Sequence, residues 1–548
     1  MRTPVTPPTT FRGTFRTDDD ARAVYSEAAG IGRTLPIGVA VPADPDDLAT
    51  LVRWAASEKV PLVPRGSGSS MPGGAIGDGL IVDLSRWRKV GAVDVAGKTI
   101  RVGPGITRGE VDRIARAQGL RFPPDPSSGA FCSVGGMAST NAAGAHSMHF
   151  GMTRRWVRAI DCVFSDGSRA EIRRGEPIPR GIPALDRLQA IAPELIASER
   201  KDPSRHHGVI KDASGYGVAD FADSNELVDL LIGSEGTLAF FVELELMLTP
   251  VADATSSVLG AFARLEDAVV AASRARAGGA VACEMLERTF LDVAASGGAP
   301  RQVPAESEAA LLAEVEGVDA EAASKAAKAV EEVFRTAGAT TTQIALDEHT
   351  ETELWELRHA ASPILSKLDV NLKSMQFIED CAVPPENLPA YVRGIREILG
   401  RHDTRVVIFG HAGDCHIHVN PLVDVRRPDW RATVESILTE VVALASRLGG
   451  TLSGEHGDGR LRAPLLHEVW SAEALAQFRR VKDAFDPDGI LNPGAKLAVA
   501  GERAIAGVKY DPSAPTLPPR ARAALDRVER ARDYARFRLD LLDDSASS

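Results

Sequence analysis

The sequence predicts an α+β protein with two main domains, and three observations support this prediction. A chain of 548 residues exceeds what one hydrophobic core usually supports. Residues up to about 250 alternate short apolar runs with Gly and Pro, whereas later residues contain longer helical patterns. The stretch "LAFFVELELMLTP", which ends at Pro250, alternates Val242, Leu244 and Leu246 with glutamates. This is the period of a strand with one buried face, and we expect it to close the first domain.

Four segments are expected along the chain. Residues 1–34 form an N-terminal arm, and residues 35–250 form the first domain. Residues 251–498 form the second domain, in which "ARLEDAVVAASRARAGG", "EAASKAAKAVEEVFRTAG" and "VESILTEVVALASRLGG" predict helices that end in glycine. Strands such as "TRVVIFG" lie between these helices, so this domain mixes α and β structure. Residues 499–548 form a proline-rich linker and a C-terminal helix.

The C-terminal stretch "ARAALDRVERARDYARFRLDLLDD" has one helical pattern, with Leu525, Val528, Ala535, Leu539 and Leu542 on the same stripe. A helix that binds a membrane surface or a partner has such a stripe. Acidic residues are mixed with its arginines, however, which favours a solvated helix docked on its own protein.

Composition narrows the classes of function. The net charge of −12 provides no overall attraction to nucleic acid or to an anionic membrane, although peripheral membrane association stays open. No signal peptide and no run of about 18 apolar residues is present, so a cytoplasmic location is expected. The five cysteines are scattered and never form C-x-x-C, which indicates reduced thiols and argues against an iron-sulfur cluster in this chain.

Three loops rich in Gly, Ser and Thr are the first chemical signal. They are "VPLVPRGSGSSMPGG", "PPDPSSGAFCSVGGMASTNAAG" and "LIGSEGTLAF". Glycines allow backbone N–H groups to approach a phosphate, and successive amides can form a concave anion site. The first loop is not G-x-G-x-x-G followed by a helix, so an ordinary dinucleotide-binding fold is not supported.

The second signal is "GHAGDCHIHVNP", which contains three histidines of the twelve in the chain. It predicts a strand, a turn and a returning strand, with His416, His418 and Asn420 on one face and His411 across the turn. The loop "SGEHGDGR" adds Glu455 and His456. Such a set of side chains indicates a metal site or a catalytic base.

These motifs and their order resemble a known family. "PRGSGSS", "PPDPSS…CSVGGMASTNAAG" and "GSEGTL" resemble the FAD-binding domain of the vanillyl-alcohol oxidase and p-cresol methylhydroxylase superfamily. "GHAGDCHIHVNP", "SGEHGDGRLR" and "VKDAFDPDGILNPGAKL" are similar to the C-terminal domain of FAD-linked oxidases, so the resemblance covers residues 35–498. It is greatest to D-2-hydroxyacid dehydrogenases of the D-lactate, D-2-hydroxyglutarate and glycolate type. The fold this implies has an FAD-binding α+β domain and an α/β substrate (cap) domain.

The resemblance also implies the residues that bind the cofactor. FAD is expected to be non-covalent, because the loop "PRGSGSSM" contains no histidine that could attach it. The implied FAD-binding residues are Pro64, Arg65, Gly66, Ser67, Gly68, Ser69, Ser70, Pro124, Asp125, Ser133, Gly135, Gly136, Asn141, Gly233, Ser234, Glu235, Gly236 and Asn492.

A catalytic site is implied in the same way. His411, His418 and Glu455 would bind a divalent metal, either zinc or manganese or iron. The metal would lower the pKa of the C2 hydroxyl, His456 would take its proton, and a hydride would pass to the flavin N5. The substrate would meet Arg358, Ser362, Lys373, Asn420 and His456. From the residues alone, a surface ion pair on a helix is the favoured role of Arg358.

Many relatives have Gly-Asn where this chain has Cys415 and His416. His416 could be an additional ligand, a substrate contact or a packed bystander, and we favour a bystander or a residue that supports the ligands.

The expected function is FAD-dependent oxidation of a D-2-hydroxy acid, most similar to that of the D-lactate and D-2-hydroxyglutarate enzymes. Several relatives are fused to an iron-sulfur domain, whereas this chain ends before such a cysteine cluster. The expected electron acceptor is therefore separate: an iron-sulfur subunit, an electron-transfer flavoprotein, a quinone or a cytochrome. A homodimer stays open. Two alternatives remain, a flavin-bearing electron-transfer subunit of a larger oxidase and a metallohydrolase that uses His411, His418 and Glu455.

Overall fold

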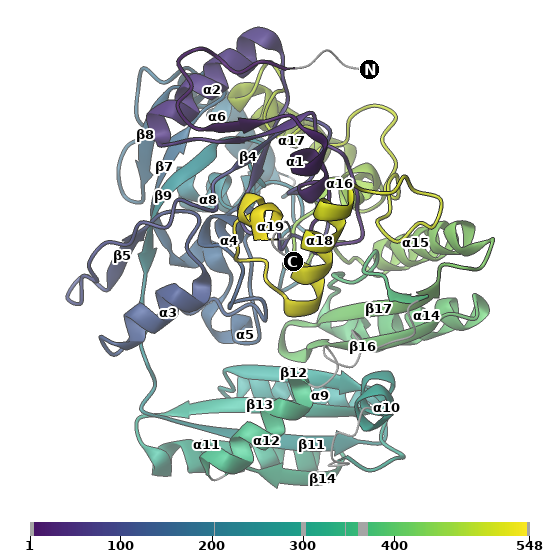
Figure 1. Ribbon diagram of the computed structural model, residues 1–548. Coiled ribbons are helices and arrows are strands. Elements are labelled where there is room, and N and C mark those ends of the chain that lie inside the picture. The colour runs from purple at the N-terminus through teal and green to yellow at the C-terminus, as the bar shows by residue number, and fades with distance from the viewer. Residues whose placement is uncertain (1–4, 202, 297–302, 346, 360–370, 545–548) are drawn as a thin grey trace.

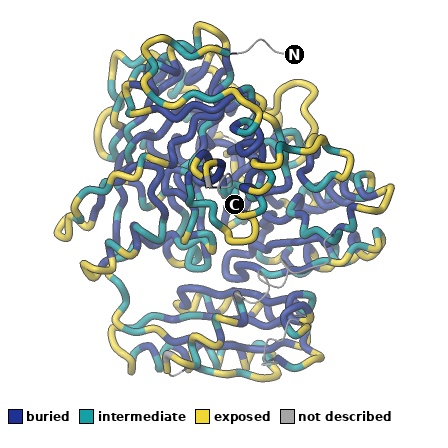
Figure 2. The backbone as a smooth tube through the Cα atoms, viewed as in Figure 1, coloured by how far each residue is buried: buried dark blue, intermediate teal, exposed yellow. Residues whose placement is uncertain are grey.

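The computed structural model describes residues 5–201, 203–296, 303–345, 347–359 and 371–544 (Figure 1). Helices and strands are mixed throughout these residues, as the sequence predicts. Two four-stranded sheets lie in the first part of the chain, and a seven-stranded sheet lies in the second part. Buried residues follow the inner strands of these three sheets, whereas several edge strands are more exposed (Figure 2).

The first sheet has the order β1 (Thr14–Arg16), β2 (Gly38–Val41), β4 (Leu80–Asp83) and β3 (Leu62–Arg65). Strands β2, β4 and β3 are parallel, and β1 is antiparallel to β2. All four residues of β2 and of β4 are buried, and apart from Asp83 at the end of β4 they are glycine or apolar residues, as expected for parallel strands covered on both faces. Strand β3 ends at Arg65, so the first Gly-rich loop begins at the carboxyl end of a parallel strand.

Helix α2 (Pro45–Glu58) connects β2 to β3, and its sequence sets both of its ends. The Asp44 side chain accepts a hydrogen bond from the Asp47 N–H at 2.9 Å, and Pro45 occupies the first turn. Lys59 ends the helix in a left-handed conformation. Leu48, Leu51 and other apolar residues on one face of α2 pack in the same core as the first sheet.

The second sheet has the order β5 (Thr99–Val102), β9 (Phe240–Met247), β7 (Val157–Val163) and β8 (Arg169–Arg173), all antiparallel. The strand predicted before Pro250 is β9. Leu244 and Leu246 are fully buried, whereas Glu243 and Glu245 are only partly buried, so the predicted alternation is confirmed.

The third sheet has seven antiparallel strands in the order β14, β11, β13, β12, β16, β17 and β15. Their bounds are β14 Ala339–Ile344, β11 Ala254–Phe262, β13 Ala309–Gly317, β12 Ala282–Glu287, β16 Arg405–His411, β17 His416–Asp424 and β15 Leu372–Ser374. The three helices predicted from glycine-terminated patterns are α9 (Leu265–Ala277), α11 (Ala320–Thr336) and α15 (Trp430–Arg447). This sheet carries the histidine hairpin, because β16 and β17 are its two strands.

The prediction of one C-terminal helix is wrong. Two helices, α18 (Pro519–Ala531) and α19 (Arg538–Asp544), are separated by Arg532, which has φ 52°. Their apolar side chains share a core with helix α1 (Asp19–Val24) and with β2. The docked position is therefore confirmed, and the apolar stripe is covered by the protein itself. Among the described helices, none is long and apolar enough to cross a membrane.

His146 links the second Gly-rich loop to the third sheet through two carboxylates. Its Nδ1 lies 2.5 Å from Asp125, and its Nε2 lies 2.8 Å from Glu314 on β13. Burial alone would lower the pKa of His146, but Asp125 and Glu314 outweigh burial and hold that pKa well above its usual value.

The raised pKa of His146 predicts a pH-dependent contribution to stability. Its stabilisation is fully present below the ordinary pKa of histidine and is lost as the pH rises through the raised pKa. We expect His146→Gln to lower the midpoint of thermal unfolding by about 2–4 °C at pH 6, and by less at alkaline pH. Scanning calorimetry across this range, with the exposed His349→Gln as control, measures the difference. An equal deficit at pH 6 and pH 10 would contradict the assignment.

Candidate active site

A single cavity of about 1210 Å³ joins the Gly-rich loops of the first domain to the histidine hairpin of the second. The predicted site residues that line it are Pro64, Arg65, Gly66, Ser67, Gly68, Ser69, Ser70, Asp125, Ser133, Gly135, Gly136, Glu235, Gly236, Arg358, Lys373, His411, His418, Asn420, Glu455 and His456. Residues separated by up to about 390 positions therefore face one space.

The loop Gly66–Ser70 has the features of an anion site. The N–H groups of Ser67 to Ser70 bind no acceptor among the described residues, and Gly68 has φ 73°. The buried Oγ atoms of Ser70 and Ser234 also lack a partner there. A Cβ on Gly66 would lie 2.2 Å from the Oγ of Ser133, so only glycine allows this approach. Unpaired donors beside a glycine cradle fit the phosphates of FAD.

Several predicted cofactor residues support the loops instead of lining the cavity. Asn492 is fully buried and donates to the carbonyls of Gly74 and Glu235. Asn141 accepts a hydrogen bond from the Arg154 N–H at 2.9 Å. Pro124, Gly233 and Ser234 likewise do not line the cavity. Ser362, predicted to contact substrate, lies outside the described residues.

The predicted metal ligands converge. The Nε2 atoms of His411 and His418 lie 3.3 and 3.4 Å from the same oxygen of Glu455, Oε1. All three residues are buried, and their ligand atoms lie within 4.8 Å of one another. Two imidazoles and one carboxylate at these distances fit zinc, manganese or iron.

The hairpin and its neighbours explain this convergence. His411 ends β16 and pairs with His416 in the register, and Phe409 pairs with His418. The Nδ1 of His411 is 2.5 Å from Glu284 Oε1, and the Nδ1 of His418 is 3.2 Å from the Glu379 carbonyl. Each ring is thereby fixed so that Nε2 faces Glu455, as metal-binding histidines commonly are.

His416 is better placed for metal binding than the sequence indicates. It is fully buried, and its Nε2 lies 2.9 Å from Asp380. Its Nδ1 has no hydrogen-bond partner among the described residues. Burial lowers the pKa of His416 to about 3, so its imidazole is neutral. A neutral ring with a free nitrogen meets the requirement for a further ligand beside His411 and His418.

Lys211 is a site residue that sequence reasoning missed. It is 1% exposed, and its Nζ lies 2.6 Å from Glu455 Oε2. Although burial would raise the pKa of Glu455, Lys211 and His411 hold that pKa well below its usual range. Lys211 lies in "IKDASGY", and no spacing in that stretch relates it to the later "SGEHGDGR".

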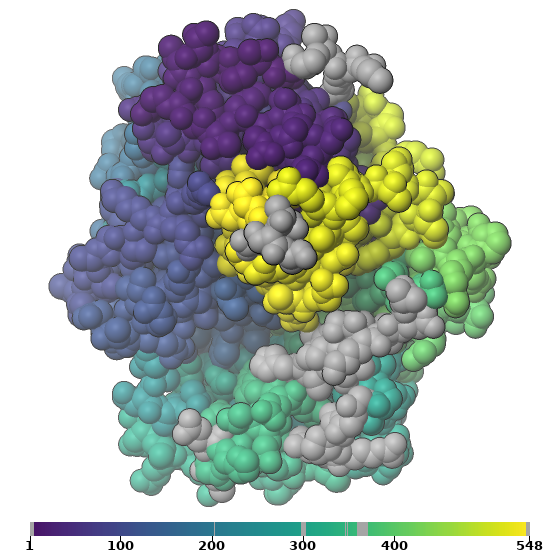
Figure 3. All heavy atoms as spheres, viewed as in Figure 1, coloured from purple at the N-terminus to yellow at the C-terminus, as the bar shows by residue number. Residues whose placement is uncertain are grey.

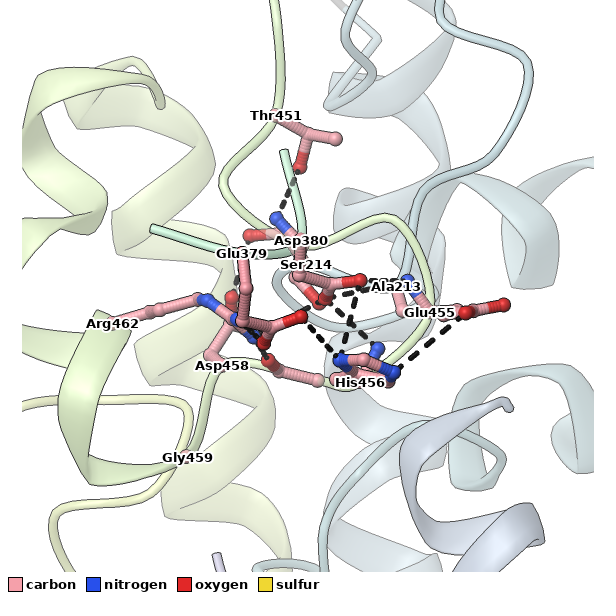
Figure 4. A network of polar contacts seen from close by, with 12 residues as sticks. Ala213, Ser214, Glu379, Asp380, Thr451, Glu455, His456, Asp458, Gly459 and Arg462 are labelled. Carbon is pink, nitrogen blue, oxygen red and sulfur yellow. Dashed lines mark hydrogen bonds and ion pairs between the residues drawn. The ribbon is translucent and has the colours of Figure 1, made fainter. Parts of the chain in front are cut away.

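His456 is held by a pair of buried carboxylates (Figure 4). Its Nδ1 lies 2.8 Å from Glu379 Oε2, and its backbone N–H donates to Asp380 at 2.9 Å. Arg462 binds both carboxylates. Burial would lower the pKa of His456, but Asp380 and Glu379 raise it to about 10. A divalent cation at Glu455 would act on this pKa in the opposite direction, because like charges repel.

The loop that carries Glu455 and His456 is fixed from both ends. Asp380 accepts hydrogen bonds from the N–H groups of Glu455 and His456 and from the hydroxyl of Ser453. Glu235 accepts from the N–H groups of Asp458 and Gly459 at 2.6 and 2.9 Å. Glu235, predicted to bind FAD, therefore uses its carboxylate to join the third Gly-rich loop to the loop of Glu455 and His456.

Arg358 is not a surface ion pair. Its side chain is 12% exposed, and its Nε lies 2.7 Å from Glu284 Oε2. Because Glu284 also binds His411, one carboxylate orients both the predicted substrate-binding arginine and a predicted metal ligand. Lys373 lies on β15 with its Nζ 5.3 Å from the centre of the Tyr510 ring.

Comparisons with known proteins agree with this geometry. Residues 36–173 match the FAD binding domain, and residues 252–495 match the C-terminal domain of FAD linked oxidases. The chain belongs to the FAD-linked oxidase family. This family membership removes the support for the metallohydrolase alternative, since the first two Gly-rich loops lie within the match to the FAD binding domain.

Relatives of this FAD-linked oxidase act on hydroxy acids, as their names state. Glycolate oxidase subunit GlcD of Bacillus subtilis is 28% identical over 88% of this chain and 94% of its own length. D-lactate dehydrogenase of Archaeoglobus fulgidus is 28% identical over 83% of this chain and 90% of its own length. D-2-hydroxyglutarate dehydrogenase of Pseudomonas putida is 29% identical over 88% of this chain but only 50% of that protein.

Solved structures support the fold of this FAD-linked oxidase. p-Cresol methylhydroxylase with substrate bound has a TM-score of 0.64 at 14% identity, covering 88% of this chain and 94% of that chain. Alkyldihydroxyacetonephosphate synthase has a TM-score of 0.60 at 16% identity, and the match covers 87% of this chain and 82% of that chain. The expected vanillyl-alcohol oxidase-like fold is confirmed.

Proposed function

We propose that this FAD-linked oxidase is a D-2-hydroxyacid dehydrogenase that oxidises D-lactate or D-2-hydroxyglutarate to the 2-oxo acid, assisted by a divalent metal. One observation carries the proposal. The cavity that contains the anion-binding loop also contains His411, His418, Glu455 and His456. A hydroxy acid in this cavity would therefore lie between the flavin and a set of metal-binding and proton-accepting groups.

The carboxylate of the substrate is assigned to the cationic wall of the cavity. Arg358 offers a guanidinium that can bind a carboxylate through two hydrogen bonds, and Lys373 adds a second positive charge. The carboxylate of Glu284 fixes the orientation of Arg358 by accepting a hydrogen bond from the Nε–H of Arg358. Asn420, on the same strand as His418, adds an amide to the same wall.

His456 is the group we assign to the hydroxyl proton. With Nδ1 held at Glu379, the neutral ring presents Nε2 as the acceptor. Nε2 lies 3.6 Å from Glu455, so the proton leaves beside the predicted metal ligands. When bound, the metal would acidify the hydroxyl and FAD would accept the two electrons of the C2–H bond. Glu379 and Asp380 stabilise the imidazolium that results.

The electron acceptor of the reduced protein is proposed to be a separate protein or a quinone. The name of the Bacillus subtilis relative, a glycolate oxidase subunit, supports a partner subunit. A purely electron-transferring role for this chain is disfavoured, because His411, His418, Glu455 and His456 converge in the cavity and a carrier has no use for them.

The visible spectrum of the purified protein tests the proposal. Without oxygen, we expect the flavin band near about 450 nm to bleach on addition of one D-2-hydroxy acid and not of its L-isomer. D-lactate, D-2-hydroxyglutarate and glycolate are the acids to compare. A yellow, metal-loaded protein that no hydroxy acid reduces would contradict the proposed substrate class. A colourless protein that does not take up FAD would contradict the flavoenzyme itself.

A further inference from the structure

The predicted pyrophosphate loop is held from behind by segments outside its own domain. The carbonyl of Gly68 accepts a hydrogen bond from the Ala29 N–H at 3.0 Å, and that of Ser70 accepts one from Gly30 at 3.3 Å. The carbonyl of Ser67 accepts one from Arg538 at 3.4 Å. Each carbonyl points opposite to the N–H of the same trans peptide. The N–H groups of Gly68, Ser69 and Met71 belong to these three peptides and therefore point away from these partners. Among the described residues they bind no acceptor.

Arg538 is a buried cation that forms no ion pair with a described carboxylate. It is 3% exposed, and its Nε and Nη1 atoms have no hydrogen-bond partner among the described residues. Arg65, on the other side of the loop, is also buried, and burial together with Arg538 lowers the pKa of Arg65 to about 10. The buried carboxylate of Asp83, which accepts a hydrogen bond from Tyr25, lies near both guanidinium groups. One negative charge beside two buried positive charges leaves an excess of positive charge, and such an excess favours an anion nearby.

The C-terminal segment that carries Arg538 is joined closely to the N-terminal arm. Lys509 donates to the carbonyls of Ala28 and Ala29 and forms an ion pair with Glu529 at 2.7 Å. A Cβ on Gly30 would lie 1.7 Å from the carbonyl oxygen of Met71, so the arm touches the loop at backbone distance. Figure 3 shows the C-terminal segment lying against the N-terminal part of the chain.

The same segment reaches the cavity. Tyr534 lines it, and its ring lies 5.3 Å from Phe131, which comes from the second Gly-rich loop. The Arg538 guanidinium lies 5.4 Å from the centre of the Tyr534 ring. The match to the C-terminal family domain ends at residue 495, so this segment lies beyond the matched residues.

We propose that residues 509–544 and 26–30 form a clamp that fixes the pyrophosphate loop for FAD, with Arg538 as its positioning residue. Arg538 holds the Ser67 carbonyl, turns the Gly68 N–H toward the phosphates and adds positive charge behind them. The clamp rests on FAD binding by this family and not on the proposed substrate. It assigns the C-terminal segment a role in retention of the cofactor.

Titration of the full-length apoprotein with FAD tests the clamp, with quenching of flavin fluorescence as the signal. We expect Arg538→Gln to weaken FAD binding about 10- to 100-fold. Binding of riboflavin, which lacks phosphates, is expected to stay unchanged. Lys509→Met, which loosens the arm, is expected to give a smaller loss with the same dependence on phosphate. The matched control is Arg503→Gln, since Arg503 is 70% exposed, pairs with Glu435 and lies outside residues 509–544.

Thermal unfolding separates positioning from a purely structural role. Removal of an unpaired buried charge should leave the midpoint of the apoprotein unchanged or higher, and should reduce the rise caused by FAD. Equal FAD affinity in wild type, Arg538→Gln and Lys509→Met would overturn the clamp. An equal loss of FAD and riboflavin binding with a less stable apoprotein would do the same. Wild-type protein that binds no FAD would instead overturn the flavoprotein assignment.

Discussion

His456→Ala should retain its FAD and lose reduction by substrate, with a rate about 10²- to 10⁴-fold lower than that of wild type. The Nε2 of His456 faces the cavity beside Glu455, and Glu379 and Asp380 stabilise its protonated form. No other imidazole of the described site combines this position with two carboxylates at its back. Anaerobic stopped-flow at the flavin band measures the rate directly.

The control for this variant is His467→Ala, because His467 is 65% exposed and its Nε2 lies 3.2 Å from the exposed Glu468. In this control variant, substrate should reduce the flavin at the wild-type rate. A wild-type rate in His456→Ala would remove His456 from the role of base. Loss of FAD together with activity would show that the variant disturbs the fold, and His456→Gln would then be the variant to measure.

Glu455→Ala should lose the divalent metal while it keeps FAD, and its metal affinity should fall by about 100-fold or more. Glu455 Oε1 is the atom on which His411 and His418 converge, so its loss removes the only carboxylate of that ligand set. The rate at which substrate reduces the flavin should fall together with the metal content. This rate should not recover when metal is added. Elemental analysis and the flavin spectrum of the same sample report the two cofactors separately.

Removal and return of the metal in wild type is the companion measurement. Chelation should abolish reduction, and one of zinc, manganese or iron should restore it, which names the metal. Glu468→Ala, at an exposed position, should behave as wild type. If Glu455→Ala binds metal as tightly as wild type, the assignment of Glu455 as a ligand is wrong. If chelation leaves the rate unchanged, the metal has no part in the reaction.

Much of this fold was predictable because its signals are local. The alternation in β9 depends only on the period of a strand, and the ends of α9, α11 and α15 depend on glycines next to apolar stripes. The hairpin of β16 and β17 follows in the same way from a turn between two apolar runs. The C-terminal helix was predicted as continuous, since its stripe persists through Arg532, where the backbone turns.

The candidate site was predictable only in part. Short motifs contain His411, His418, Glu455 and His456, and the residue types in these motifs indicate metal binding or proton transfer. Lys211, Glu284, Glu379 and Asp380 do not lie in such motifs, because each acts through a partner far away in the chain. The local sequence around a buried lysine or glutamate does not show which charged residue it will contact.

The sequence by itself determined the two-domain α+β organisation, the Gly-rich loops and the residue types of the candidate metal ligands and the candidate base. These depend on periodicity and composition over a few residues, which a linear chain displays. Only the tertiary structure decided how those groups are oriented. It placed Glu284 behind His411 and Arg358, Lys211 against Glu455, and Arg538 behind Ser67. Burial removes the water that would otherwise separate and screen these charges, so their pairing is set by packing between distant segments.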